Sequence, residues 1–175
     1  VIPVYVFDPH WFGTTSFGFP KTGGHRTRFL IETVDILRKN LRDIGSDLVI
    51  RHGHTPQELS SVINEVQANV VFAPKEVTAE EKDIEQSVKA NLSIPIEFVR
   101  AHTLFHPDDI PYKEDTIPKV FTNFRKQVEK KSTVQPCYQK PDALPPVSVK
   151  EVGSLPTPSE LGVKIIGRDE RGVLR

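Results

Sequence analysis

Apolar residues in the first hundred positions follow two different spacings. Four short runs, rich in β-branched and aromatic residues, predict strands at residues 1–7, 48–50, 70–73 and 96–99. Between these runs, apolar positions recur every three or four residues and predict amphipathic helices, the first over residues 26–44. Strand and helix alternate, and parallel crossovers are right-handed. The expected fold class is therefore α/β, a doubly wound (Rossmann-like) parallel sheet flanked by helices.

The ends of the helices carry their own signals. Thr55 and Glu58 have the spacing of a capping box, with Pro56 at the first helical position. Gly45 is placed to end the preceding helix. The first strand is apolar throughout, which predicts burial on both faces. The inward face of the first helix is expected to consist of Leu30, Val34, Leu37, Leu41 and Ile44.

The alternation stops at His102. A last, basic helix is predicted over residues 119–131, and residues 132–175 hold six of the 15 prolines with little periodicity. That composition is typical of an extended Pro-rich linker. We therefore expect an α/β domain over residues 1–131 and a linker over residues 132–175 that runs along a second domain, absent from these 175 residues.

Composition and charge argue against several classes of function. The 23 basic and 23 acidic residues give a formal net charge of zero, which offers no global electrostatic case for binding nucleic acid. Basic residues of the last helix are expected to form a solvated face, because Phe121, Phe124 and Val128 share its apolar side. The single cysteine, Cys137, excludes an internal disulfide and is expected to be inert. No apolar run is long enough to span a membrane.

Sequence motifs for common catalytic and metal sites are also missing. There is no Gly-x-Gly-x-x-Gly, no P-loop and no Gly-x-Ser-x-Gly in the chain. The pairs His52/His54 and His102/His106 have ligand-like spacing, but no cluster of acidic or cysteine residues accompanies them. Structural or exposed histidines, and no catalytic or metal site, are therefore expected.

Two strand ends carry the candidate binding residues. Ligands of parallel sheets bind beyond the carboxyl ends of the strands. Asp8 and Pro9 end the first strand and open a loop rich in aromatic residues, which favours either a ligand-facing or an interface-facing role. Lys75 and Glu76 follow the strand at residues 70–73, where they form either half of a ligand site or a solvent-exposed turn.

Several segments resemble one known family. VIPVYVFDP at residues 1–9, SFGFPKTGGHRTRFL at 16–30, VFAPKE at 71–76 and VFTNFRKQVE at 120–129 are similar to the amino-terminal antenna domain of photolyases and cryptochromes. FGFPKTG is most like the cryptochrome-DASH branch. The resemblance covers roughly residues 1–165, with the motifs in the same order.

The resemblance implies a chromophore and residues to hold it. Such a domain typically binds a reduced folate of the methenyltetrahydrofolate type, and Glu76 corresponds to the acidic residue that hydrogen-bonds the pterin. Phe19 could stack on a flat heterocycle and Lys21 could meet a carboxylate, although packing against the absent domain is the alternative for this loop. With Lys75, Asp8 and Pro9 these residues complete the expected site.

One departure from the family bears on the sheet. In the family VIPVYVF is the second strand, and the first is central and ends in an Arg-x-Asp-Leu-Arg motif that this sequence lacks. Without it, the strands at Val1 and Val70 would expose unpaired edges. Either the chain is an incomplete piece, which we favour, or the sheet is rearranged.

The functional expectation follows from the resemblance. We expect a light-harvesting antenna domain of a blue-light flavoprotein, for DNA repair or photoreception. A deoxyribodipyrimidine photolyase is one candidate for the parent protein. FAD would bind only in the absent helical domain, DNA only through the parent, and this chain alone would not be catalytic. The alternative is a non-catalytic α/β docking or regulatory module of a larger protein. We expect a soluble intracellular protein without membrane contact; plastid, mitochondrion and nucleus all stay open as its location.

Overall fold

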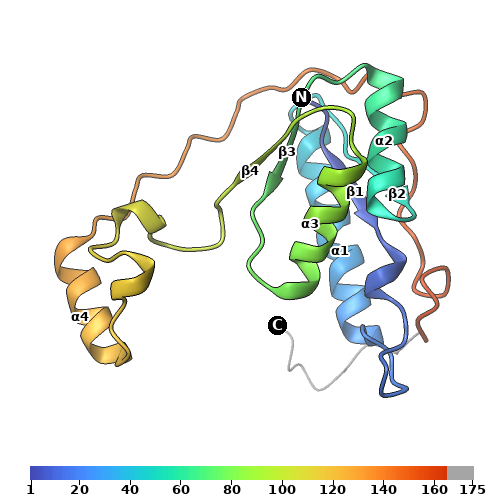
Figure 1. The fold of residues 1–175 in the computed structure, drawn as a ribbon. Coiled ribbons are helices and arrows are strands. Elements are labelled where there is room, and N and C mark those ends of the chain that lie inside the picture. The colour runs from blue at the N-terminus through green and yellow to red at the C-terminus, as the bar shows by residue number, and fades with distance from the viewer. Residues whose placement is uncertain (165–175) are drawn as a thin grey trace, which may run out of the picture.

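The computed structural model describes residues 1–164. Three 3-10 turns in this part lie at Pro9–Trp11, Pro107–Asp109 and Glu114–Thr116. The order of strands and helices confirms the α/β fold class predicted from the sequence (Figure 1). The elements are β1 (Val4–Phe7), α1 (Gly24–Arg42), β2 (Val49–His52), α2 (Thr55–Val66), β3 (Val71–Pro74), α3 (Ala79–Asn91), β4 (Ile96–Val99) and α4 (Phe121–Lys131).

The parallel strands form two separate pairs. β1 pairs with β2, with Val4 opposite Val49, and β3 pairs with β4, with Val71 opposite Ile96. Within residues 1–164 no ladder joins β1 to β3. The prediction that the first strand is buried on both faces is wrong, since only Phe7 of β1 is buried. The other three residues are half-buried because no strand pairs with that edge of β1.

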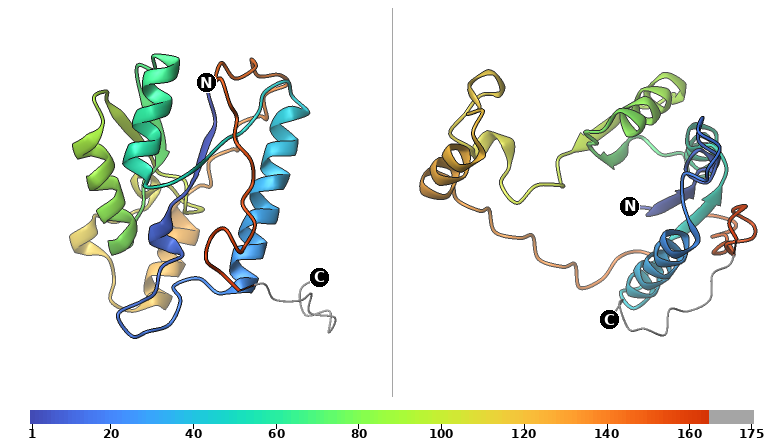
Figure 2. Two further views of the ribbon diagram at one scale, coloured as in Figure 1. Left: turned by 90° about the vertical axis from the view of Figure 1, so that its right-hand side faces the viewer. Right: turned by 90° about the horizontal axis from the view of Figure 1, so that it is seen from below.

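Helices lie on both faces of the strands. Figure 2 shows α1 on one side of β1 and β2, and α2 and α3 on the other. The buried core cluster of Phe7, Val34, Leu48 and Ile50 fills the space under α1. This layering is the doubly wound arrangement expected of strands joined by crossover helices.

The inward face of α1 departs from the predicted one at Leu37. Leu37 is 45% exposed, whereas the neighbouring Arg38 is only 8% exposed. Arg38 donates through Nε to Asp47 Oδ1 at 2.8 Å and through Nη1 to the carbonyl of Gly153 at 3.0 Å. These two acceptors compensate the cost of burying the guanidinium. Because Arg38 occupies the inward position, its neighbour Leu37 faces solvent. Gly45 follows the helix with φ +91°, a conformation that favours glycine.

The Pro-rich segment lies against this chain's own sheet. Leu144 N–H donates to the carbonyl of Ile44 at 2.8 Å, and Ile50 N–H donates to the carbonyl of Val152 at 2.7 Å. Residues around Val152 therefore cover the outer edge of β2. That this segment also runs along a second domain stays a prediction. Residues 165–175 of the predicted linker lie outside the described residues.

Helix α4 stands apart from the α/β layers, joined to them by extended segments (Figures 1 and 2). Val128 is its buried residue, and Phe124 stacks on Tyr112 with ring centroids 5.9 Å apart. Phe121, by contrast, is 72% exposed. None of the helices in the described part has the length and apolar content needed to cross a bilayer.

Candidate functional site

The loops that follow β1 and β3 meet at one edge of the fold. Lys21, from the loop after β1, donates through Nζ to Glu80 Oε1 in the first turn of α3 at 3.1 Å. His10 Nε2 lies 3.1 Å from the same Nζ. The Lys21 hydrogen bond lowers the pKa of the Glu80 carboxyl. We call this edge, formed by residues 8–23 and 75–80, the carboxyl-end rim.

Asp8 is buried at the base of the rim and is fully occupied by backbone and hydroxyl donors. Its Oδ1 accepts from His10 N–H at 2.9 Å, and its Oδ2 accepts from Thr55 N–H at 2.8 Å and Thr55 Oγ1 at 2.7 Å. Burial raises the pKa of this carboxyl, but the hydrogen bonds from His10 and Thr55 outweigh burial and lower it. Asp8 therefore joins the end of β1 to the start of α2.

The capping box predicted at the start of α2 is wrong. The N-cap residue is His54, which makes no side-chain cap hydrogen bond, and Thr55 is already helical. The first-turn N–H and hydroxyl of Thr55 are satisfied instead by Asp8, 47 positions earlier in the chain. The tertiary contact replaces the local one because the carboxylate at the end of β1 lies next to these donors and accepts from both.

Glu76 occupies a different position, half-buried at the end of β3. Its N–H donates to Glu85 Oε1 at 2.6 Å, and its carboxylate oxygen Oε1 lies 3.3 Å from His102 Nε2. The adjacent Lys75 is exposed, and its N–H donates to the carbonyl of Val99 at 2.8 Å. Glu76 thus presents a carboxylate at the rim, while the Lys75 side chain reaches solvent.

The aromatic loop after β1 folds into a small hairpin-like turn. Thr14 and Pro20 form an isolated antiparallel bridge, and Gly18 has φ +84°, which favours glycine. Phe17 and Phe19 stack with centroids 6.2 Å apart and are 85% and 56% exposed. Aromatic rings exposed to this extent favour a contact with another surface or ligand.

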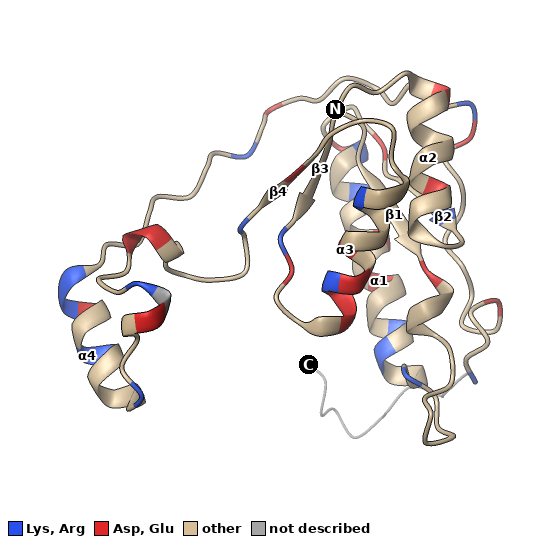
Figure 3. Cartoon of the chain, in the orientation of Figure 1, with Lys and Arg blue, Asp and Glu red and all other residues tan. Residues whose placement is uncertain are grey.

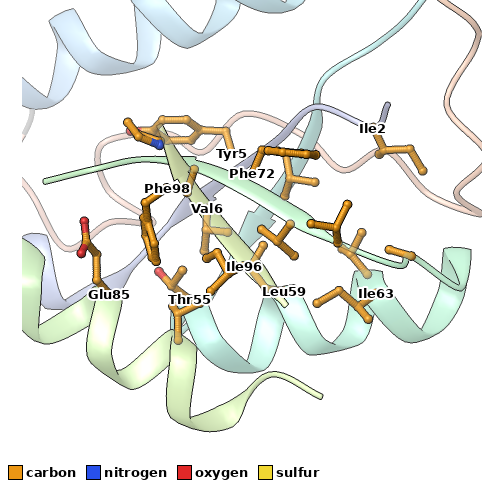
Figure 4. A pocket seen from close by; sticks show the side chains of 18 of the residues that line it. Ile2, Tyr5, Val6, Thr55, Leu59, Ile63, Phe72, Glu85, Ile96 and Phe98 are labelled. Carbon is orange, nitrogen blue, oxygen red and sulfur yellow. The ribbon is translucent and has the colours of Figure 1, made fainter. Parts of the chain in front are cut away.

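A cavity of about 840 Å³ lies between β1 and β3. Val6 of β1, Phe72 of β3, and Leu59 and Ile63 of α2 surround it (Figure 4). Its lining is mainly apolar, with the carboxylates of Glu76, Glu81 and Glu85 among the polar groups. Of the six residues predicted for binding, only Glu76 lines this cavity; Asp8, Pro9, Phe19, Lys21 and Lys75 do not.

Trp11 also lines the cavity, a role that the sequence did not reveal. The aromatic enrichment of the loop pointed to it only as one of several aromatic residues. Trp11 is the last residue of the 3-10 turn that follows Asp8, and this turn brings its side chain to the cavity. The rim and cavity together offer a carboxylate, ammonium groups and apolar walls, a set that suits a flat heterocycle with polar edges.

The histidines do not gather into a metal centre. His54 Nδ1 lies 3.6 Å from Asp8 Oδ1, and His52 Nε2 lies 3.1 Å from the carbonyl of Ser154. Nowhere in the described part do three or more His, Cys, Asp or Glu side chains form a group that could hold a metal ion. Over the described residues basic and acidic side chains are mixed, including those of α4, and the first turn of α3 is acidic (Figure 3).

Comparison with known proteins shows to which protein family the chain belongs. The family model for DNA photolyase matches residues 1–146. The chain belongs to the DNA photolyase family and forms its amino-terminal α/β domain.

Several of the similar proteins are cryptochromes of the DASH branch. A cryptochrome DASH of Gloeobacter violaceus is 41% identical over the whole chain, which covers 36% of that protein. The chloroplastic/mitochondrial cryptochrome DASH of Arabidopsis thaliana is 40% identical over 94% of the chain and 30% of the relative. The crystal structure of a Synechocystis cryptochrome matches with a TM-score of 0.89 at 34% identity, covering 99% of this chain and 36% of that one. The chain therefore spans about a third of the length of its relatives.

Proposed function

We propose that this chain is the light-harvesting antenna domain of a blue-light flavoprotein of the cryptochrome-DASH type. The observation that carries the proposal is its similarity to a DASH cryptochrome along the whole chain at 41% identity. The flavin and its redox chemistry belong, in this proposal, to the part of the parent protein outside these 175 residues. This chain supplies binding and orientation for a second chromophore, and it is not catalytic by itself.

The proposed chromophore is a reduced folate of the methenyltetrahydrofolate type, bound at the carboxyl-end rim. The half-buried carboxylate of Glu76 at the mouth of an apolar cavity supports this choice. A carboxylate can accept two parallel N–H bonds from the 2-amino-pyrimidinone edge of a pterin. Phe19 offers a ring face for stacking, and the ammonium groups of Lys21 and Lys75 suit the carboxylates of the folate.

Asp8 and Pro9 take a supporting role in this proposal. Both oxygens of the Asp8 carboxylate already accept hydrogen bonds from the fold, and only 4% of the residue is exposed. Pro9 begins the 3-10 turn that carries His10 and Trp11. The two residues fix the path of the loop, so that Lys21 and Phe19 reach the rim.

The proposed partner is the helical flavin domain of the parent, which would hold FAD and make any contact with DNA. Large apolar side chains exposed in two places support such a contact. Phe17 and Phe19 lie on the rim loop, and Leu104 and Phe121 lie in the separate segment that carries α4. Exposed apolar surface of this kind marks interfaces between domains.

The test is the substitution Glu76→Gln in the full-length parent. Glutamine keeps the size of the side chain but places an amide donor opposite a ligand donor, and such a mismatch costs about 1–3 kcal/mol. Folate affinity should therefore fall by roughly tenfold to a hundredfold, with flavin content unchanged. Near-ultraviolet absorbance of the purified protein gives the folate-to-flavin ratio. Glu97→Gln on β4, which changes the same charge on an exposed strand residue, is the matched control.

Two results would contradict the proposal in different ways. An unchanged folate-to-flavin ratio in Glu76→Gln would make Glu76 a turn residue and remove it from the site. A parent protein that carries no near-ultraviolet chromophore, and that binds no added methenyltetrahydrofolate, would favour the docking or regulatory module instead.

A further inference from the structure

The segment that follows β4 carries two histidines, His102 and His106, and their side chains have different partners. Nε2 of His102 lies 3.3 Å from Oε1 of Glu76, at the carboxyl-end rim. Nδ1 of His106 lies 3.5 Å from Oδ2 of Asp108, within its own segment. The two histidines therefore do not act as a pair, but His102 contacts the candidate chromophore site.

The pairing of β3 with β4 brings His102 to Glu76. The two strands are parallel, with Pro74 opposite Val99, and Lys75 N–H donates to the carbonyl of Val99 at 2.8 Å. Parallel strands end at the same edge of a sheet, so the chain leaves β3 and β4 at neighbouring points. Glu76 is the second residue after β3 and His102 is the third after β4. Their contact therefore follows from the register of the ladder.

The backbone and the side chain of Glu76 are held by different residues. Glu85 Oε1, from α3, accepts from Glu76 N–H at 2.6 Å, and Figure 4 shows Glu85 directed from α3 toward the strands. This bond fixes the backbone of the turn but leaves the Glu76 side chain free to rotate about its own bonds. Within residues 1–164, His102 is the side chain paired with the Glu76 carboxylate.

An imidazole can restrict this carboxylate without using up its acceptors. The neutral tautomer of His102 with its proton on Nε2, and the imidazolium, can both donate to Oε1. An ionised carboxylate has about four acceptor positions, so Oε2 and one position on Oε1 stay available for two parallel N–H donors. Such a two-bond contact requires both oxygens to face the ligand. A side chain that is already oriented binds at a smaller entropic cost.

We propose that His102 is a positioning residue of the chromophore site: its imidazole orients the Glu76 carboxylate toward the ligand and does not itself touch the ligand. The proposal rests on the antenna function proposed above. The side chains of His102 and Glu76 are 47% and 32% exposed, and pairs exposed to this extent add little to stability. Replacing His102 should therefore leave the fold intact, so that a change in affinity reports on the site.

The first test measures the affinity of the full-length parent for added methenyltetrahydrofolate by near-ultraviolet absorbance. His102→Ala should weaken binding by about threefold to tenfold, which corresponds to the ordering of one side chain. His102→Gln, whose amide keeps an N–H donor at a similar reach, should restore affinity to within about twofold of the unsubstituted protein. His106→Ala, in the same segment, is the matched control and should bind normally. Flavin content and melting temperature should be unchanged in all three variants.

A double-mutant cycle tests whether His102 acts through Glu76. In a Glu76→Ala background no carboxylate remains to be oriented, so adding His102→Ala should weaken binding by less than about twofold. If it weakens binding by the same factor as in the unsubstituted parent, His102 contacts the ligand or the fold instead, and the inference is wrong. Failure of His102→Gln to restore affinity would also overturn it.

The results distinguish this inference from the proposed function. If Glu76→Gln weakens folate binding and His102→Ala does not, the chromophore site stands and the role of His102 is wrong. If neither weakens it, the chromophore site is wrong and the role of His102 falls with it.

A crystal structure of the ligand-free parent tests the orientation without any chromophore. Glu76 should take one side-chain orientation in the unsubstituted protein and in His102→Gln, and several orientations in His102→Ala. One unchanged orientation in His102→Ala would overturn the inference.

Discussion

Replacing Asp8 tests whether this carboxylate serves the fold. It accepts three hydrogen bonds, from His10 N–H and from the N–H and hydroxyl of Thr55, at 2.7 to 2.9 Å. Removing a capping side chain costs about 0.5–2 kcal/mol, and hydrogen bonds to a charged group contribute about 1.5–3 kcal/mol each. Water can reach part of the freed groups, so Asp8→Ala should lower the free energy of unfolding by about 2–4 kcal/mol. That is a large fraction of the total for a domain of this size.

The assay is urea unfolding at pH 7, followed by circular dichroism. Asp83→Ala, which removes an exposed aspartate from α3, is the matched control and should change stability by less than about 0.5 kcal/mol. A double-mutant cycle with Thr55→Val isolates the bond to the Thr55 hydroxyl, with an expected coupling of about 1 kcal/mol. If Asp8→Ala is as mild as Asp83→Ala, the capping role assigned here is wrong.

The pH dependence provides an independent check on Asp8. Its pKa is lowered in the folded state, because the hydrogen bonds outweigh the effect of burial. The stabilisation is therefore complete above the unfolded pKa of about 3.9 and is lost as pH falls through the folded value. The difference in stability between the unsubstituted chain and Asp8→Asn should be largest near neutral pH and should shrink in acid. A difference that stays constant down to pH 2 would contradict this account.

Three further substitutions test other parts of the fold. Burial alone would raise the pKa of Asp47, but hydrogen bonds from Arg38, Arg42 and the backbone of Leu48 outweigh it and lower the pKa to about 2. Asp47→Asn should therefore lower the free energy of unfolding in urea by about 1–2 kcal/mol at pH 7, and by less below pH 3. Gly153 has φ +76°, and a Cβ there would overlap the carbonyl oxygen of Ile50; Gly153→Ala should therefore release the segment that covers β2, measured as faster hydrogen exchange at Ile50. Glu80→Gln weakens the bond from Lys21 and should speed trypsin cleavage after Lys21 severalfold, with little change in overall stability.

The periodic parts of the fold could be predicted from sequence, because they depend on local spacing. The strand predicted at residues 96–99 coincides with β4, and the predicted helix over 26–44 begins and ends within two residues of α1. The same reasoning failed for Leu37 and Arg38. The buried Arg38 is compensated by Gly153, 115 positions away in the chain, and no local pattern reports such a pair.

Only part of the candidate site could be predicted from the sequence. The position of Lys75 and Glu76 at the end of a strand followed from the strand pattern. The role of Asp8 did not, since an aspartate that ends a strand at the ligand-binding edge looks the same whether it faces a ligand or a distant helix. Only the approach of Thr55, set by the packing of α2 beside β1, distinguishes the two.

The position of Glu76 explains why its test needs the full-length parent. Glu76 follows β3 directly and lines the cavity, and within the described residues β3 is paired only with β4. Its backbone is held by Glu85 and its carboxylate lies 3.3 Å from His102 Nε2, so the turn that carries it is already partly ordered. Ordering a binding group before the ligand arrives removes that cost from the binding free energy. Further contacts to β3 in the parent would order this turn more, and the Glu76→Gln comparison therefore uses the full-length protein.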